Sequence, residues 1–288
     1  MSGSELPRGS VVNFFTRKSV EMKDRTISQF GEQWETFSED TGFFGSKDLL
    51  ADFVNPFDCA KFRGANVGDL GAGGGRFSIA LLEFGAQHVF AIEPSESVRV
   101  IRRKAEALGL ADRITILNVQ AHQVLAELQL DYIVSLGVIH HIPHPRPAVE
   151  AAINALRPGG MLIVWLYAKE GNALYLAMIT PIRILCRLFS LRAKSFLVRI
   201  LDIPLVFYIW TCKLLPALPL PLSTYMRSIL ARLDSSRRRL VIYDQLSPDY
   251  AKYYKKEDVI ELFSGLGELE LHWRKRYSWL AFVRKTGL

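Results

Sequence analysis

The sequence predicts an α/β fold: a doubly wound, mostly parallel sheet of seven strands with an antiparallel edge pair and an inserted helical cap. Between residues 66 and 167, short apolar segments alternate with segments of helical pattern. Several of the short segments are apolar throughout, as parallel strands covered on both faces are. Two later segments, 269–274 and 278–284, are close enough in sequence to pair antiparallel.

Five strands are expected in the alternating region, each ended by a turn. They are residues 67–70, 88–92, 114–117, 132–136 and 161–167. Helices are expected between them at 77–82, 97–108 and 148–156. Gly109 and the run Arg157-Pro158-Gly159-Gly160 follow two of these helices, as helix-ending residues commonly do. Strands alternating with helices in this way indicate a parallel sheet with helices on both faces.

The positive charge is concentrated in one segment. Residues 171–240 contain eleven Lys and Arg against Asp202 and Asp234, a net charge of +9, whereas the whole chain carries +7. The segment is also apolar and rich in proline, and it is read as an inserted set of helices. Such asymmetry favours contact with an anionic surface or ligand.

Cysteine usage indicates a reducing compartment. Cys59, Cys186 and Cys212 are far apart and odd in number, so they provide neither a metal-ligand pair nor a disulfide framework. The first residues contain no apolar stretch of the signal-peptide type. A cytoplasmic protein without a metal site is expected.

A glycine-rich loop, Gly71-Ala72-Gly73-Gly74-Gly75, joins the first predicted strand to the following helix. Glycine allows the backbone to approach a ligand closely and to adopt positive φ. A tight turn without a ligand is the alternative for such a loop taken alone. Glu93, followed by Pro94, ends the second strand, where an acid accepts hydrogen bonds from both hydroxyls of a ribose. The same acid could instead serve as the acidic residue of a helix N-terminus.

Both a nicotinamide dinucleotide and S-adenosylmethionine fit these two features, and the glycine spacing discriminates between them. A dinucleotide fingerprint requires a third glycine at position 76, which is Arg76 here. Asp69, just before the loop, offers an opposite charge to a cofactor with a cationic amino group. S-adenosylmethionine is therefore the expected cofactor, and a nicotinamide-dependent oxidoreductase is the alternative.

Four motifs in order resemble class I S-adenosylmethionine-dependent methyltransferases. They are DLGAGGG, the acid in AIEPS, DYIVSLGVIHHIP, and LRPGG followed by an apolar strand. Within that family the chain is similar to small-molecule enzymes, including those of ubiquinone and menaquinone biosynthesis. The resemblance covers about residues 66–166 and implies a Rossmann-like methyltransferase fold. The segment YDQLSPDYAKYYKKEDV resembles the same relatives less specifically.

The resemblance implies a role for each matching residue. Asp69, Gly71, Ala72, Gly73 and Gly75 would hold the methionine end of the cofactor, with Glu93 and Pro94 at the ribose, Gln120 and Ala121 at the adenine, and Leu136 and Gly137 at the sulfonium. Relatives often have an acid at the adenine position, and Gln120 can accept a hydrogen bond there without carrying charge. A protein that binds the cofactor without catalysis, such as a regulatory partner, stays open as a third reading.

Two histidines, His140 and His141, follow the fourth strand and are the candidate catalytic bases for an oxygen acceptor. The alternative is that they only pack and hydrogen-bond. His144 is expected in a loop, and Tyr250, Tyr253 and Tyr254 either line an acceptor pocket or belong to the core. The Asn/Asp-Pro-Pro-aromatic sequence typical of enzymes acting on nucleobase amines is absent, so a small-molecule acceptor is expected and nucleic acid is disfavoured.

The insert contains a ten-residue apolar run, 203–212, flanked by Arg199 and Lys213. It is predicted to be too short to span a bilayer. It is read either as a lid over the site or as a contact with an anionic membrane that supplies a lipid-linked acceptor. Arg183, Arg187, Arg192, Lys194 and Arg199 are expected to share an exposed face, and Arg237-Arg238-Arg239 to form a solvated face or a phosphate site.

Four segments follow from these observations. Residues 1–60 form an N-terminal helical cap, 61–169 the cofactor-binding core, 170–240 the basic apolar helical insert, and 241–288 the C-terminal completion of the sheet.

Overall fold

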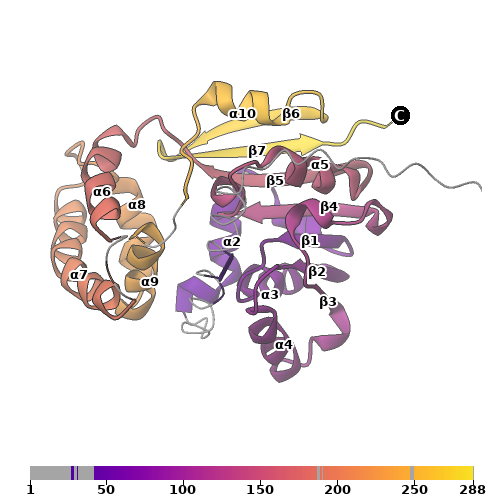
Figure 1. The fold of residues 1–288 in the computed structure, drawn as a ribbon, viewed down its shortest axis with the longest axis horizontal. Helices are drawn as coiled ribbons and strands as arrows, with labels where there is room; N and C mark the ends of the chain where they lie inside the picture. The colour runs from indigo at the N-terminus through magenta and orange to yellow at the C-terminus, as the bar shows by residue number, and fades with distance from the viewer. Residues whose placement is uncertain are drawn as a thin grey trace, which may run out of the picture.

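A seven-stranded sheet forms the centre of the molecule, in the order β3-β2-β1-β4-β5-β7-β6 (Figure 1). The computed structural model describes residues 27–28, 31, 42–186, 189, 191–246 and 250–287. Most of the predicted N-terminal cap, residues 1–60, lies outside the described residues. Its described part contains η1 (Gly42–Gly45), α2 (Lys47–Val54) and η2 (Cys59–Phe62).

The strands confirm the predicted fold class. They are β1 (Asn66–Leu70), β2 (His88–Ile92), β3 (Ile114–Leu117), β4 (Leu130–Leu136), β5 (Leu156–Tyr167), β6 (Glu268–Arg274) and β7 (Ser278–Arg284). Strands β1 to β5 pair in parallel, whereas β7 runs antiparallel to both β5 and β6. Strand β5 begins earlier than predicted: the glycine-rich turn expected before residue 161 is part of it. The register against β4 shifts there, between Leu130 and Tyr132.

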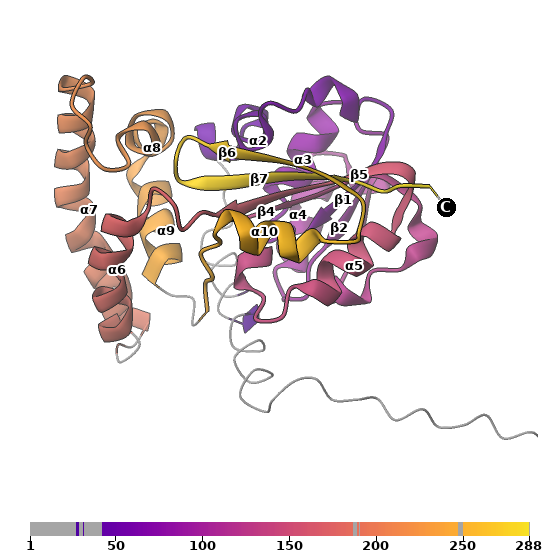
Figure 2. The same cartoon turned by 90° about the horizontal axis from the view of Figure 1, so that it is seen from above.

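Helices cover both faces of the sheet (Figure 2). The helices of the core are α3 (Arg76–Glu83), α4 (Val98–Ala107), α5 (Arg146–Asn154) and α10 (Lys256–Phe263). Short 3-10 helices are η3 (Ala111–Arg113), η4 (Ala121–Gln123), η5 (Ala126–Leu128), η6 (Ile139–His141) and η7 (Leu230–Arg232). Helices α2 and α3 lie over one face and α5 and α10 over the other.

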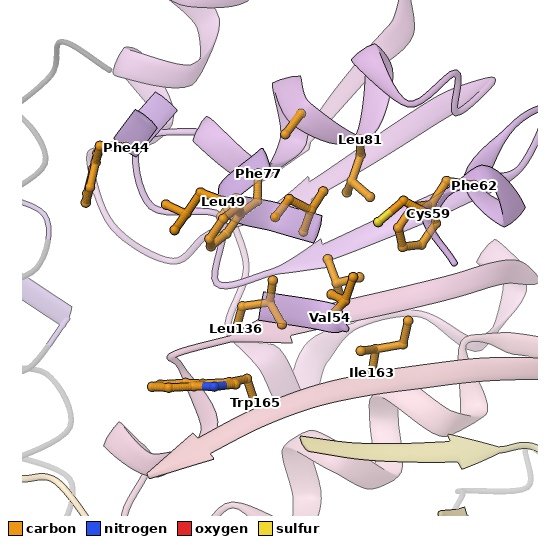
Figure 3. Packing of buried hydrophobic residues seen from close by; sticks show 14 of the residues in the cluster. Phe44, Leu49, Val54, Cys59, Phe62, Phe77, Leu81, Leu136, Ile163 and Trp165 are labelled. Carbon is orange, nitrogen blue, oxygen red and sulfur yellow. The ribbon is translucent and has the colours of Figure 1, made fainter. Parts of the chain in front are cut away.

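Two apolar clusters hold these layers together, one on each face of the sheet. Val134 and Ile163 belong to the first cluster, whereas the preceding residues Ile133 and Leu162 belong to the second. This alternation is the two-residue period of strand side chains. Figure 3 shows the first cluster, in which Leu49 of α2 and other side chains of α2 and α3 lie over β4 and β5. The core thus fixes the ends of β1, β2 and β4.

The insert forms a helical layer of its own beside the sheet (Figure 1). It contains α6 (Ala173–Cys186), α7 (Leu191–Leu214), α8 (Ser223–Ser228) and α9 (Ser235–Leu246). Pro181 and Pro204 lie inside α6 and α7, so these prolines do not separate the helices. Helix α9 continues past the predicted boundary at residue 240.

The two ends of the insert meet at one point of the core. Ala168 forms a parallel bridge with Tyr254. The Lys169 amide donates to the Tyr254 carbonyl at 2.8 Å, and the Tyr254 amide donates to the Tyr167 carbonyl at 2.9 Å. The insert therefore leaves the sheet after β5 and returns to it beside the same strand.

Candidate active site

The glycine-rich loop occupies the carboxyl end of β1 in a conformation that favours glycine. Gly71, Gly73 and Gly75 have φ values of 81°, 54° and 81°. A Cβ atom on Gly71 would lie 2.4 Å from a methyl carbon of Val138, so the loop is pressed against the segment after β4. The Ser97 hydroxyl donates to the Gly73 carbonyl at 3.0 Å. The loop is thus held with its backbone at the edge where ligands of open α/β sheets bind.

Glu93 lies at the end of β2 with its carboxylate against this loop. It accepts hydrogen bonds from the Gly73 amide at 2.9 Å and from the Ser95 amide at 3.0 Å. The side chain is 7% exposed. A carboxylate offers about four acceptor positions, so two remain for a ligand. The geometry therefore combines both sequence readings: Glu93 binds backbone amides as a capping acid does, and it keeps the capacity to bind a ribose.

Asp69 lies beneath the loop. Its carboxylate accepts a 2.7 Å hydrogen bond from the Ser78 hydroxyl and is buried. Burial, with a further contribution from the negative charge of Glu93, raises the pKa of Asp69 to about 6. Its bond to Ser78 joins β1 to α3, the two elements that the loop connects.

A cavity of about 510 Å³ begins at the loop and extends into the insert. Nine of the eleven predicted cofactor residues line it: Gly71, Ala72, Gly73, Glu93, Pro94, Gln120, Ala121, Leu136 and Gly137. Asp69 and Gly75 are outside this lining. The Gln120 side chain accepts from the backbone of Gln123 at the start of η4, so its oxygen is shared with a helix cap.

The two candidate histidines occupy different places. His141 lines the cavity, and its Nδ1 atom lies 2.9 Å from the Tyr250 carbonyl oxygen. That carbonyl only accepts, so Nδ1 carries the proton and Nε2 is the acceptor nitrogen. Burial lowers the pKa of His141 to about 4, which keeps the ring neutral at pH 7.

His140 is fully buried and is not part of the cavity lining. Its ring lies 3.9 Å from the ring of Tyr167, between centroids. Neither ring nitrogen has a hydrogen-bond partner among the residues that the structure describes. Burial lowers the pKa of His140 well below its usual value. This placement fits packing, the alternative considered for the histidine pair, whereas His141 keeps access to a ligand.

Side chains of the insert complete the cavity. Its walls there are mainly apolar, formed by Met178, Ile179, Ile182, Leu201, Leu205, Val241 and Ile242. Polar side chains interrupt them where the insert meets the core, namely Tyr167, Tyr175, Tyr225, Asp244, Gln245 and Tyr253. Met178 is 64% exposed, so the cavity reaches the surface at α6.

Residues 69–162 match the family model described as a methyltransferase domain. This part of the chain is a methyltransferase domain. The chain is 24% identical over 155 residues to the ubiquinone biosynthesis O-methyltransferase of Hydrogenovibrio crunogenus, covering 52% of this chain and 61% of that protein. It is also 28% identical over 105 residues to the tRNA 5-carboxymethoxyuridine methyltransferase of Escherichia coli K12, covering 36% of this chain and 40% of that protein.

The chain thus spans less than two thirds of the length of these relatives. Among solved structures, it is similar to magnesium protoporphyrin IX methyltransferase from Synechocystis PCC 6803 with bound SAH, with a TM-score of 0.54 and 15% identity. That likeness covers 93% of this chain and 99% of that chain, and it shows a shared fold.

The methyltransferase domain includes the loop, Glu93 and His141, whereas the insert lies outside the matched residues. Sequence patterns missed two cavity residues here. No motif surrounds Tyr175, and Gln245 lies in the segment YDQLSPDYAKYYKKEDV, whose resemblance to the relatives did not single it out. Of the three tyrosines considered, Tyr253 lines the cavity, Tyr254 is 1% exposed in the core, and Tyr250 contributes its carbonyl to His141. His144 is an exposed loop residue.

Helix α7 of the insert is longer than the apolar run within it. By length and composition alone, 193–214 is long and apolar enough to cross a membrane, so the ten-residue run 203–212 is part of a longer apolar helix than the sequence pattern indicated. One side of α7 nevertheless faces protein. Asp202 on that side, 5% exposed, forms ion pairs with Arg238 and Arg239 of α9, the second at 3.1 Å. Helix α7 is thereby tied to the rest of the insert beside the methyltransferase domain.

The expected distribution of cations in the insert was partly wrong. Arg237 is buried, and Arg238 and Arg239 pair with Asp202, so the arginine triplet is not a solvated face. Lys194 is buried and Arg183 is part-buried, whereas Arg199 is exposed. Arg187 and the side chain of Arg192 lie outside the described residues. Pairing with an acid distant in sequence, which a local pattern does not reveal, explains the triplet.

The three cysteines, one in η2 and two in the insert, are buried free thiols. Over the described ranges, no three His, Cys, Asp or Glu side chains are grouped to hold a metal ion.

Proposed function

We propose that the protein transfers a methyl group from S-adenosylmethionine to a small, largely apolar acceptor. The observation that supports this most directly is the continuity of the cavity. It joins the glycine-rich loop and Glu93 at one end to the apolar walls of the insert at the other. A cofactor and an acceptor in one continuous cavity are positioned relative to each other, which is the main requirement of this reaction.

The loop and its neighbours fit this cofactor. S-adenosylmethionine supplies a methyl group on a positively charged sulfur. Gly71, Ala72 and Gly73 would hold its methionine end, with Glu93 and Pro94 at the ribose, Gln120 and Ala121 at the adenine, and Leu136 and Gly137 near the sulfonium. The two unused acceptor positions of Glu93 match the two hydroxyls of a ribose. Asp69, just before the loop, and Gly75, its last residue, lie outside the cavity lining.

His141 is the residue best placed to contact the acceptor. Its Nδ1–H donates to the Tyr250 carbonyl, so Nε2 is the ring nitrogen that can accept a hydrogen bond. A neutral imidazole in this tautomer can accept a hydrogen bond from a hydroxyl of the acceptor. His140 orients this ring by packing against it, with 4.4 Å between the ring centroids.

Glu93→Ala is expected to weaken binding of S-adenosylhomocysteine by about 1–3 kcal/mol, through the loss of charged hydrogen bonds to the ribose. Isothermal titration calorimetry measures this directly. The matched control is Glu96→Ala, because Glu96 is an exposed acid in the next turn, paired only with Arg99 at 2.8 Å. If Glu93→Ala binds as tightly as the parent, Glu93 only caps the loop.

The same titration separates the alternative functions. NAD should give no heat of binding, and tight NAD binding would favour a nicotinamide-dependent oxidoreductase. A mass increase of one methyl group in a compound from cell extract would establish turnover. Binding of the cofactor without any such product would favour a non-catalytic partner protein.

The acceptor is proposed to be a small apolar or lipid-linked molecule and not a nucleic acid. The insert side of the cavity is walled by aliphatic side chains, which favour hydrocarbon over charged phosphates. One of the relatives described above acts on tRNA by name, but its likeness covers 36% of this chain.

The outer face of α7 is proposed to rest on an anionic membrane at the cytoplasmic side. Exposed apolar side chains recur every three or four residues along it: Phe196, Ile200, Ile203, Phe207, Trp210 and Leu214. We call these six residues the outer stripe. Exposed cations, Arg199 and Lys213, lie beside it toward the two ends. Shallow insertion of aromatic and aliphatic side chains with flanking cations is the pattern of membrane-surface helices.

We expect the parent protein to sediment with anionic vesicles at low salt and less at high salt, because salt screens exposed charges. Phe207→Ser combined with Trp210→Ser should leave the protein in the supernatant. Leu108→Ser is the matched control, since Leu108 is 56% exposed but lies outside the outer stripe. A parent that stays in the supernatant with both anionic and neutral vesicles would contradict membrane contact. A change from dimer to monomer in the double variant would instead identify the outer stripe as a contact between copies.

A further inference from the structure

A hydrogen-bonded network joins the insert to the core at the wall of the cavity. It consists of Tyr167 at the end of β5, Tyr175 and Arg183 on α6, Gln245 on α9, and Tyr253 before α10. We call it the seam network. Tyr167, Tyr175, Gln245 and Tyr253 line the cavity, and Arg183 lies behind them. The cofactor residues described above are not part of it.

The acceptor capacity of Gln245 is used up within the seam network. Its Oε1 atom accepts from the Tyr175 hydroxyl at 2.6 Å and from Nη2 of Arg183 at 2.9 Å. An amide oxygen has two lone pairs, so these donors occupy it. The Tyr253 hydroxyl is a third and more distant neighbour at 3.3 Å. Nε2 of Gln245 donates one proton to the Tyr167 hydroxyl at 2.7 Å.

Two protons are then left for a ligand in the cavity. The Tyr167 hydroxyl proton and the second amide proton of Gln245 have no acceptor among the described residues. A third, the Tyr253 hydroxyl proton, is held by a long hydrogen bond of 3.3 Å to Gln245 Oε1, which a ligand can replace. Burial raises the pKa of Tyr167 well above its usual value, so this residue stays a donor. These donors select an electronegative oxygen, beside the carboxylate of Asp244, which also lines the cavity.

The positive charge of Arg183 in the seam network also favours an electronegative ligand. The partners of Arg183 are neutral, namely Gln245 and the Tyr253 hydroxyl, and it forms no ion pair with a carboxylate in the described part of the chain. A part-buried guanidinium normally has an anionic partner. Asp244 is the nearby acid on α9, and it has an interaction of its own. The cation is therefore available to a bound anion.

We infer that the seam network binds an anionic oxygen, of the carboxylate kind, on an otherwise apolar methyl acceptor. Tyr167, Gln245 and Tyr253 donate to this oxygen, and Arg183 supplies the opposite charge from behind. The aliphatic walls beside them, including Ile182 and Val241, accommodate the hydrocarbon body. That this anion is the methyl acceptor rests on the proposed function, whereas its binding by the seam network does not.

The protonation state of His141 is consistent with an ionised acceptor. With a pKa of about 4, this imidazole is a weak base. An acceptor that enters already ionised requires no proton to be removed before it reacts. A neutral aliphatic alcohol would require a stronger base than this site offers.

The test compares three ligands with the same chain: dodecanoate, dodecanol and dodecylamine, each titrated into the full-length protein at pH 7. We expect dodecanoate to bind at least about tenfold more tightly than either of the others, as a hydrogen bond to a charged group does. Tyr253→Phe and Arg183→Met should each reduce that preference by about tenfold or more. Tyr277→Phe is the matched control, because Tyr277 lines the cavity outside the seam network.

Equal affinity for the three ligands would overturn the inference. It would also be overturned if Tyr277→Phe lost as much of the preference for dodecanoate as Tyr253→Phe does. Arg183→Met also removes contacts within the fold. If that variant does not fold, Tyr253→Phe decides the question, because it removes only a hydroxyl. S-adenosylhomocysteine is titrated into the same samples. If S-adenosylhomocysteine binds but dodecanoate is not preferred, the anion-binding inference alone is refuted. If dodecanoate is preferred but S-adenosylhomocysteine does not bind, the methyltransferase proposal alone is refuted.

Discussion

Gly73→Ala is expected to abolish measurable binding of S-adenosylmethionine. Gly73 lines the cavity, and its amide already donates to Glu93 at 2.9 Å. A methyl group at this position takes space beside the acid that the cofactor would occupy. The φ of 54° adds backbone strain of about 1 kcal/mol. Calorimetric titration gives the affinity, and circular dichroism shows that the variant is folded.

Gly109→Ala separates occupancy of the site from backbone strain. Gly109 has a φ of 65°, and an added Cβ would meet nothing within 4 Å. It follows α4 and is outside the cavity lining, so the variant shares the strain and should bind the cofactor normally. Equal losses of affinity in the two variants would mean that strain alone explains the result.

Asp202→Ala is expected to lower the free energy of unfolding by about 3 kcal/mol, because the change leaves two arginines of α9 without their carboxylate. The Asp202 side chain is 5% exposed, and that of Arg238 is 14% exposed. For a chain of this size the melting temperature should fall by roughly 6–12 °C, which differential scanning calorimetry measures. Loss of this ion pair should also weaken binding in the cavity, since α7 and α9 both supply its walls.

Glu96→Ala serves here as the control for an exposed ion pair. The side chains of Glu96 and Arg99 are 66% and 72% exposed, so the loss should be within about 0.5 kcal/mol. A loss for Asp202→Ala as small as this would show that α7 is held to the insert by its apolar contacts and not by Asp202.

The sheet and the cofactor end of the site were predictable because their signals are local. Strand β2, for example, was predicted with its observed bounds, since it is a short apolar run ended by Glu93 and Pro94. The loop glycines carry their own conformational signal, and all three adopt positive φ. Parallel strands bring their carboxyl ends to one edge, which is why the loop after β1 and Glu93 after β2 meet there.

The insert was not predictable in the same detail, because both sides of its helices are apolar. On α7, Phe207 is exposed and Ile209 is buried, and no pattern in the sequence distinguishes them. The pairing of Arg238 with Asp202 joins residues 36 apart. Likewise, only the 3-10 turn η6 decides that His141 and not His140 reaches the cavity.

The meeting of the two ends of the insert at Ala168 and Tyr254 has a consequence for how such enzymes diversify. A segment that leaves and re-enters at one bridge can be lengthened, shortened or exchanged while β5 and β7 keep their pairing. The residues proposed to bind the cofactor lie on the sheet side of that junction, and most of those proposed to surround the acceptor lie beyond it. Acceptor preference can therefore evolve as a module, by replacement of one contiguous stretch of gene, while the donor chemistry is inherited unchanged.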